Sequence, residues 1–138
     1  MATDTIDAAK AGDQPDLLGG LALVAASGEG DAERPQADSQ TARPAAWLAS
    51  ILGDSRLTPP DMAIQARESH LRTMRFLIQL SVRESSGYSL RNPPAALGGL
   101  RAALWNNQLP VPAQALALLA AAETLVNLER PTTAPHRN

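Results

Sequence analysis

The two histidines are the first residues of this sequence to consider for catalysis or metal binding, because the chain contains no cysteine. His70 lies within a long apolar helical pattern, and His136 lies in a polar stretch near the last residue. Metal ligands, or a nucleophile and its base, share one face of a helix when they are three or four residues apart. Glu68 and Ser69 stand only two residues and one residue before His70, so neither can act with it. We therefore expect His70 to be a buried or half-buried ring whose hydrogen bonds are satisfied, and not a metal ligand, a cofactor ligand or a base.

Other signatures of catalysis are also absent from the sequence. The glycine pairs Gly19-Gly20 and Gly98-Gly99 lack the GxGxxG and GxxxxGK spacings that cradle phosphates, and no strand is expected before either pair. Without cysteine there is no thiol nucleophile and no disulfide. These observations predict a protein that is not an enzyme.

Three arginines, Arg72, Arg75 and Arg83, fall on the polar strip of the same helical pattern and could contact phosphate groups. Glu68 precedes Arg72 by four residues and is placed to pair with it. The sequence pI is about 5.6, and no aromatic residue lies among the arginines on that strip, so nucleic-acid binding is disfavoured. We interpret the strip as a solvated face that steers a protein partner, and keep a nucleic-acid-binding regulator as an alternative.

The long helical pattern runs over residues 59–86 and is predicted to form the central helix of the fold. Thr58 is suited to cap its first turn, and Gly87 is suited to end it, because glycine readily adopts the left-handed conformation beyond a helix. A helix that is apolar over most of its circumference must be surrounded by other helices or by a partner. Its expected inner face consists of Ile64, Leu71, Met74, Ile78 and Val82, widened by Phe76, Leu77 and Leu80.

The composition indicates an all-α fold. Hydrophobic residues make up 44% of the chain but aromatic residues only 3%, and strands favour aromatic and β-branched side chains. We predict a small bundle of about four helices over residues 43–130, arranged around the central helix and followed by a polar tail over residues 131–138. The other helices are expected over residues 43–52, 93–107 and 112–129.

The apolar sides of these three helices are read from the helical period. In residues 43–52, Trp47, Leu48 and Ile51 fall on one side. In residues 93–107, one stripe carries Ala96, Leu97, Leu100, Ala103 and Leu104. The inner face expected for residues 112–129 consists of Ala115, Leu118, Leu119, Ala122, Leu125 and Val126.

Residues 1–42 form an acidic N-terminal arm, with eight acidic residues against two basic ones. This charge and the short polar side chains predict a largely disordered arm, in which residues 15–26 form a short amphipathic helix when docked. A secretory signal would be basic where this arm is acidic, and the most apolar run, Ala113 to Ala122, is shorter than the roughly 20 residues that span a bilayer. We therefore expect a cytoplasmic protein with no membrane span.

The pattern P-x-x-L-G-G-L occurs twice, at Pro15 to Leu21 and at Pro94 to Leu100. In a chain rich in these residue types, the repeat can arise by coincidence. Alternatively, the arm segment imitates the later segment and occupies a similar groove, either on its own body or on a neighbouring copy. Both interpretations stay open at the level of the sequence.

The combined pattern predicts a protein–protein interaction module that acts as an adaptor, chaperone or assembly subunit through helix-in-groove contacts. Its partner is expected to be another protein or a second copy of the chain. Tryptophan and arginine are frequent interface anchors, and the apolar residues of the arm can enter a groove. The predicted contact residues are Leu17, Leu18, Leu21, Val24, Trp47, Arg72, Arg75, Arg83 and Trp105.

A short stretch, Leu57-Thr58-Pro59-Pro60-Asp61-Met62-x-x-Gln65, resembles the start of the helical region in inner-rod subunits of bacterial type III secretion systems. The resemblance implies an alternative function, as a component or secreted substrate of such an apparatus, and export instead of cytoplasmic residence. It covers residues 57–65 only. Those subunits usually end soon after the matching helix, whereas two further helices are predicted here, which leaves membership of that family open.

Overall fold

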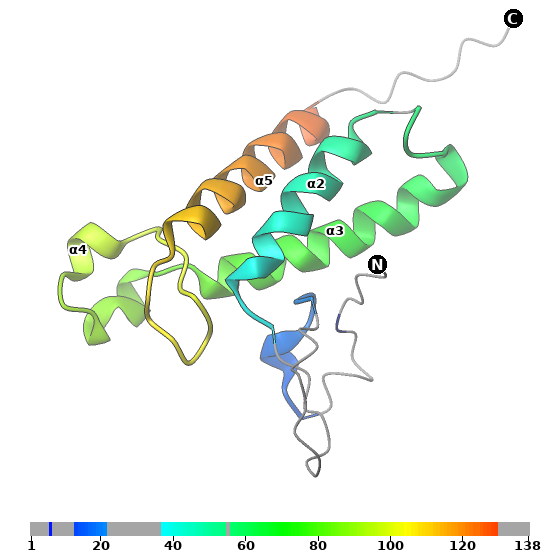
Figure 1. The fold of residues 1–138 in the computed structure, drawn as a ribbon. Coiled ribbons are helices and arrows are strands. Elements are labelled where there is room, and N and C mark those ends of the chain that lie inside the picture. The colour runs from blue at the N-terminus through cyan, green and yellow to red at the C-terminus, as the bar shows by residue number, and fades with distance from the viewer. Residues whose placement is uncertain (1–5, 7–12, 22–36, 55, 130–138) are drawn as a thin grey trace, which may run out of the picture.

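The computed structural model describes residues 6, 13–21, 37–54 and 56–129 (Figure 1). These residues form helices and isolated bridges but no β-strand, which confirms the predicted all-α helical bundle. The α-helices are α2 (Ala42–Leu52), α3 (Pro60–Leu80), α4 (Pro93–Ala96) and α5 (Val111–Glu129). The 3-10 helices are η1 (Pro15–Leu17), η2 (Ser39–Thr41) and η3 (Glu84–Ser89).

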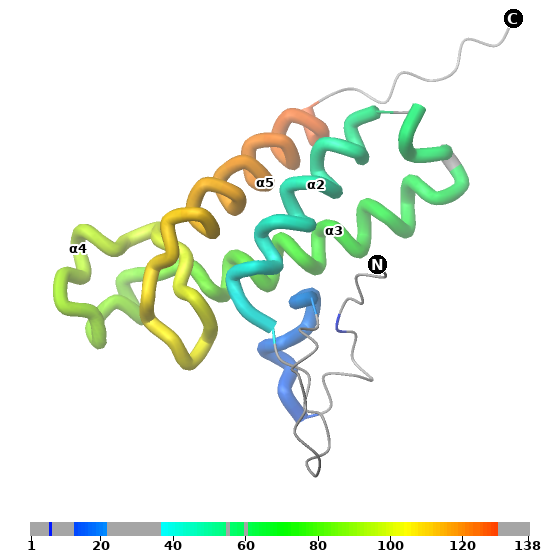
Figure 2. Tube along the Cα trace, viewed as in Figure 1, coloured from blue at the N-terminus to red at the C-terminus, as the bar shows by residue number. Residues whose placement is uncertain are grey.

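Helices α2, α3 and α5 form the bundle. Helices α2 and α5 lie side by side and run in the same direction, and α3 runs antiparallel to both (Figure 1, Figure 2). A hydrogen bond joins the C-terminal parts of the parallel pair, in which Nδ2 of Asn127 donates to the carbonyl oxygen of Ala49 over 2.6 Å. Parallel neighbours need a long connection, and α3 together with residues 81–110 provides it.

The contact between α2 and α5 is built from small side chains. Alanine ends at Cβ, so two helices that face each other with alanines can bring their backbones close together. Trp47, which is a predicted contact residue, is 75% exposed, while Leu48 and Ile51 are half-buried. The buried residues of this pair are Ala42, Ala45, Ala46 and Ala49 from α2 and Ala113 and Ala120 from α5.

Most large side chains of helix α5 are exposed, although Leu116 packs against the core. The predicted inner face of this helix is wrong, because all of its members are exposed: Ala115, Leu118, Leu119, Ala122, Leu125 and Val126. The helix is apolar around its whole circumference, so hydropathy alone does not distinguish its sides. The alanine surface of α2 selects the alanine side of α5.

The inner face predicted for helix α3 is confirmed in part, because the residues that widen it, Phe76, Leu77 and Leu80, are buried and Met74 packs against the core. The residues expected at the centre of its inner face, Ile64, Leu71 and Ile78, are 72%, 44% and 51% exposed. The apolar arc of this helix is wider than one neighbour can cover, so the packing decides which part of the arc is buried. The buried side chains are Phe76, Leu77 and Leu80, together with His70 and Thr73.

Helix α3 ends at Leu80, before the predicted residue 86. Ser81 leaves the helix with an extended backbone, and its hydroxyl donates to the carbonyl oxygen of Ile78 over 2.7 Å. The guanidinium of Arg101 donates to the carbonyl oxygens of Leu80 and Gln79 over 3.3 and 3.1 Å. These bonds satisfy backbone acceptors that a helix end leaves free. Because Arg101 is distant in the sequence, a local pattern does not reveal this ending.

The predicted helix over residues 93–107 is reduced to the four residues of α4. Leu97 (φ −55°, ψ 131°) and Gly98 (φ 78°) form a turn that ends it, and glycine tolerates the positive φ because it lacks Cβ. The glycine pair therefore ends a helical turn and does not lie inside a helix. Of the expected inner stripe, the buried residues are Ala96, Leu100 and Ala103.

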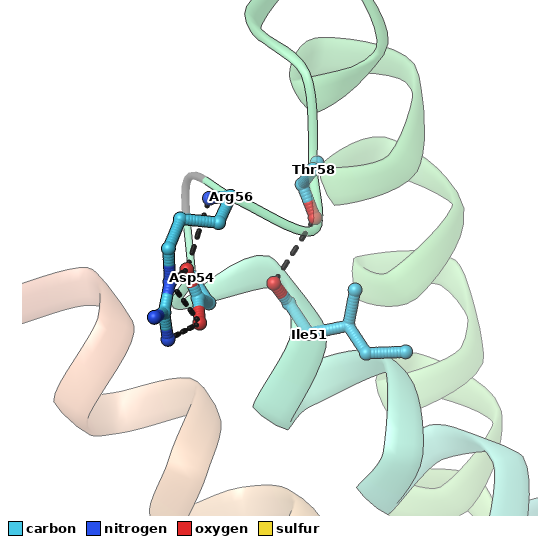
Figure 3. A network of polar contacts seen from close by, with 4 residues as sticks. All are labelled: Ile51, Asp54, Arg56 and Thr58. Atoms are coloured by element: carbon cyan, nitrogen blue, oxygen red, sulfur yellow. Dashed lines mark hydrogen bonds and ion pairs between the residues drawn. The ribbon is translucent and has the colours of Figure 1, made fainter.

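The corner between α2 and α3 is held by two polar contacts (Figure 3). Arg56 donates to the carboxylate of Asp54 from Nε over 3.0 Å, from Nη2 over 2.7 Å and from its backbone N–H over 2.9 Å. These hydrogen bonds hold the pKa of the Asp54 carboxyl below its ordinary value. The hydroxyl of Thr58 donates to the carbonyl oxygen of Ile51 over 3.0 Å. Thr58 therefore ties the start of α3 to α2. The N-cap position, which was predicted for Thr58, is held by Pro59.

Candidate interaction surface

A cavity of about 530 Å³ opens where the C-terminal parts of α2 and α5 meet the N-terminal half of α3. Its lining includes Leu52 from α2, Ile64, Arg67, Glu68 and Leu71 from α3, and Leu128 from α5. The side chains of Arg67 and Glu68 are exposed to solvent. The cavity is therefore an apolar groove with charges of both signs at its opening, and we call it the α3/α5 groove.

His70 lines this groove and is 2% exposed. The hydroxyl of Thr124 donates to the carbonyl oxygen of Ala120 over 2.6 Å, so its oxygen accepts the N–H of His70 Nε2, at 2.7 Å. Nδ1 has no hydrogen-bond partner among the described residues, and it is unprotonated when the ring is neutral. Burial lowers the pKa of His70, because it removes water from the charged ring. The prediction is confirmed for the burial of His70 and for the hydrogen bond of Nε2, whereas Nδ1 is not satisfied by a described residue.

Exposed apolar side chains extend from the groove along two helices. On α3, Ile64, Leu71 and Ile78 follow one another at seven-residue spacing and are all exposed. Seven residues are nearly two helical turns, so the three side chains form one stripe about 21 Å long. On α5 the exposed large side chains are Leu118, Leu119, Leu125, Val126 and Leu128.

The predicted anchors of the bundle lie outside the groove. Trp47 on α2 and Trp105 in the connection to α5 are 75% and 64% exposed. Arg72 and Arg75 are on exposed positions of α3, and Nη2 of Arg72 lies 3.9 Å from Oε2 of Glu68. Arg83 follows the end of α3 and is the N-cap of η3, so the predicted strip does not continue to it along one helix.

The predicted arm contributes to the bundle itself. Leu17 is 4% exposed and belongs to the main apolar cluster, Leu18 packs against that cluster, and the N–H of Leu21 donates to Oγ1 of Thr41 over 3.3 Å. The expected helix over residues 15–26 is wrong for its described part, where only the short η1 is helical. Val24 lies outside the described residues. Leu17 and Leu18 are therefore engaged with the chain's own core.

Sequence reasoning missed the residues that line the groove. It placed Ile64 and Leu71 in the core, and it did not include Arg67 or Leu128 among the predicted contact residues. The seven-residue spacing of Ile64, Leu71 and Ile78 is the one signal in the sequence that could have identified the exposed stripe. Over the described part of the chain, no group of three or more His, Cys, Asp or Glu residues is placed to hold a metal ion.

Helix α5 is long and apolar enough to cross a membrane by length and composition, with a mean hydropathy of 1.4 and 11% of its apolar window buried. The run Ala113 to Ala122, which is too short to span a bilayer, is therefore only part of a longer apolar helix. Comparison of the chain with family models, curated proteins and solved structures gives no match.

Proposed function

We propose that the protein is a non-enzymatic interaction module, which receives an amphipathic helix of a partner protein in the α3/α5 groove. The observation that carries the proposal is the distribution of side-chain sizes. Alanines fill the contact between α2 and α5, while large aliphatic side chains of α3 and α5 face outward. Contiguous exposed apolar surface is typical of sites that bind other proteins.

The geometry of the stripe on α3 favours a helical partner. Ile64, Leu71 and Ile78 repeat every seven residues, and a helix lying alongside would meet them with apolar residues at the same spacing. Full burial of one Leu or Ile side chain stabilises a complex by about 1.5–3 kcal/mol. Several such side chains are exposed on this side of the bundle, which is enough apolar surface for specific binding after the loss of rotational freedom.

The charges beside the stripe favour an acidic partner. Arg67, Arg72 and Arg75 are exposed on α3, against Glu68 as the acidic residue among them. A helix with an apolar face and flanking carboxylates would place its charges near these guanidinium groups. Such complementarity accelerates association and selects the partner more than it adds affinity.

The proposal is tested with a model helix of about 20 residues, labelled with fluorescein, that carries leucine at heptad spacing and glutamate at the flanking positions. We expect the full chain to bind this peptide, and the double variant Ile64→Asp/Leu71→Asp to bind it at least about tenfold more weakly, equivalent to about 1.4 kcal/mol. The matched control is Tyr88→Asp, because Tyr88 is 85% exposed in η3, outside the groove. Fluorescence anisotropy gives the dissociation constants.

Two outcomes would contradict the proposal. In the first, the double variant and the control bind the peptide equally well. In the second, the chain does not bind the peptide but co-sediments with neutral phosphatidylcholine vesicles. The apolar side of α5 would then be a surface that binds membranes.

A further inference from the structure

Two segments of the chain form the same backbone structure, which we call a hook. Hook 1 consists of Ile6 and residues 15–21, and hook 2 consists of Val82 and residues 94–100. In hook 1, the N–H of Ile6 donates to Gly20 O over 2.8 Å, and the N–H of Gly19 donates to Ile6 O over 3.0 Å. The equivalent bonds of hook 2 are Val82 N–H to Gly99 O, 2.8 Å, and Gly98 N–H to Val82 O, 2.9 Å.

The turns inside the two hooks also agree. Leu18 has φ −56° and ψ 124°, and Leu97 has φ −55° and ψ 131°. The following glycines, Gly19 and Gly98, have φ of 88° and 78°, as the third position of a type II turn requires. A backbone hydrogen bond closes the turn in each hook. In hook 1 the N–H of Gly20 donates to the carbonyl oxygen of Leu17 over 3.0 Å, and in hook 2 the N–H of Gly99 donates to that of Ala96 over 2.9 Å.

Each hook is also tied to the helix that follows it. The N–H of Leu21 donates to Oγ1 of Thr41, next to the start of α2, and the N–H of Leu100 donates to Oε1 of Gln114 in the first turn of α5. Because hydrogen bonds, dihedral angles and helix attachment all agree, the repeated P-x-x-L-G-G-L pattern specifies one structure in two places.

The surroundings of the two turns differ. Hook 1 is seated on α3, where a Cβ built at Gly19 would overlap the carbonyl oxygen of Arg72. Gly20 lies against Phe76 of the same helix, and a Cβ built at Gly20 would be 3.3 Å from Cε2 of Phe76. We call this surface of α3, formed by Arg72, Thr73 and Phe76, the slot. At Gly98 a Cβ would meet no atom within 4 Å, and Leu97 beside it is 48% exposed.

We propose that the slot binds hook 2 of a second copy of the chain when hook 1 leaves it, so that the protein assembles by exchange of hooks. The slot accepts only a turn that has no Cβ at the position of Gly19. Among the described residues, Gly19 and Gly98 alone have positive φ. Hook 1 occupies the slot and hook 2 presents the same turn to solvent. The chain itself therefore supplies the complementary partner.

Hook 1 acts as an internal competitor in this arrangement. It belongs to the same chain as the slot, so its effective concentration exceeds that of a second molecule at ordinary protein concentrations. The full chain is then a monomer, and it self-associates only when hook 1 is displaced. The contact joins two different surfaces, hook 2 and the slot, so it links copies head to tail.

The test uses the full chain and sedimentation velocity at several concentrations. Gly19→Val places a Cβ where the Arg72 carbonyl lies and disfavours the positive φ, so we expect the average mass to rise with concentration. Adding Gly98→Val to this variant is expected to restore the monomer, because the second hook is then lost. Gly98→Val alone is the control and stays monomeric, with the far-ultraviolet circular dichroism of the wild-type chain.

A monomeric, helical Gly19→Val chain at several hundred micromolar would overturn the proposal. Self-association that persists in the double variant would do the same, because the exposed apolar faces would then be its cause.

A second measurement covers the case in which Gly19→Val does not fold. Thr41→Val removes the hydrogen-bond acceptor of Leu21 and leaves the slot intact. A labelled peptide of residues 92–101 is expected to bind this variant at least tenfold more tightly than the same peptide with Gly98→Val. Equal binding of the two peptides would show that the slot does not recognise the hook.

Discussion

Nε2 of His70 on α3 and Oγ1 of Thr124 on α5 lie 2.7 Å apart and join the two helices at the base of the α3/α5 groove. The two residues are 54 positions apart in the sequence. The Thr124 hydroxyl is already committed to the carbonyl oxygen of Ala120, so Nε2 of the histidine must donate, and burial of the ring favours its neutral form. This bond links the protonation state of one side chain to the packing of α3 against α5.

We predict that the free energy of unfolding decreases as the pH falls from 7.5 to 5.5. Burial lowers the pKa of His70 in the folded chain below its ordinary value of 6.5, so the unfolded chain binds more protons in this range. The stability is fully present above the unfolded pKa and is lost as the pH falls toward the folded pKa. Urea denaturation at the two pH values measures the change, and His70→Gln is expected to abolish most of it. An unchanged pH dependence in that variant would contradict the prediction.

Replacing Thr124 by valine is expected to lower the free energy of unfolding by about 1–2 kcal/mol, because the His70 N–H is left buried without an acceptor. Thr124→Ser keeps the hydroxyl and serves as the matched control, with a smaller loss. Urea denaturation at pH 7.5 separates the two variants. If serine and valine destabilise the chain equally, the methyl group and not the hydrogen bond is responsible.

Ala45→Leu is predicted to destabilise the fold by about 1–3 kcal/mol, because Ala45 is fully buried in the α2/α5 contact, where a larger side chain forces the helices apart. The control is Ala115→Leu on the exposed side of α5, for which the expected change is below about 0.5 kcal/mol. Thermal unfolding followed by circular dichroism compares them. Similar effects at both positions would argue against close packing of the alanines.

Gln114 is predicted to be required for the attachment of hook 2. Its Oε1 accepts from the N–H of Leu100 and its Nε2 donates to the carbonyl oxygen of the same residue, both over 2.6 Å. Gln114→Leu removes both bonds and is expected to lower the free energy of unfolding by about 1–3 kcal/mol. Hydrogen exchange of the Leu100 amide should accelerate in this variant. The control Gln114→His keeps a polar side chain. If the Leu100 amide exchanges equally fast in Gln114→His and in Gln114→Leu, the geometry of the glutamine amide is what holds hook 2.

The sequence was informative where the cause of a structure is local. Prolines and turn residues set the approximate starts of α2, α3 and α5, and the isolation of His70 from other ligands predicted its role as a buried, hydrogen-bonded ring. The repeated P-x-x-L-G-G-L pattern was visible too, since a type II turn needs glycine at a definite position. Its meaning required the structure, because the slot on α3 is built from residues about 50 positions away from hook 1.

Predictions that depend on which neighbour a helix meets were wrong. The end of α3 at Leu80 depends on Arg101, and the short length of α4 depends on the pairing of Gly98 and Gly99 with Val82. Leu71 and Leu118 were expected inside and are exposed. In each case the hydropathy pattern allows more than one arrangement, and a contact distant in the sequence selects one.

Residue types and spacing by themselves determined that this chain is helical, that its helices are apolar on more than one side and that two glycine turns repeat. Only the tertiary structure decided which sides are buried. Alanine faces allow the backbones of α2 and α5 to approach closely, and this close contact excludes the larger side chains from the interface. Ile64, Leu71 and Ile78 of α3 and Leu118, Leu125 and Leu128 of α5 are left on the surface, and Ile64, Leu71 and Leu128 line the apolar groove.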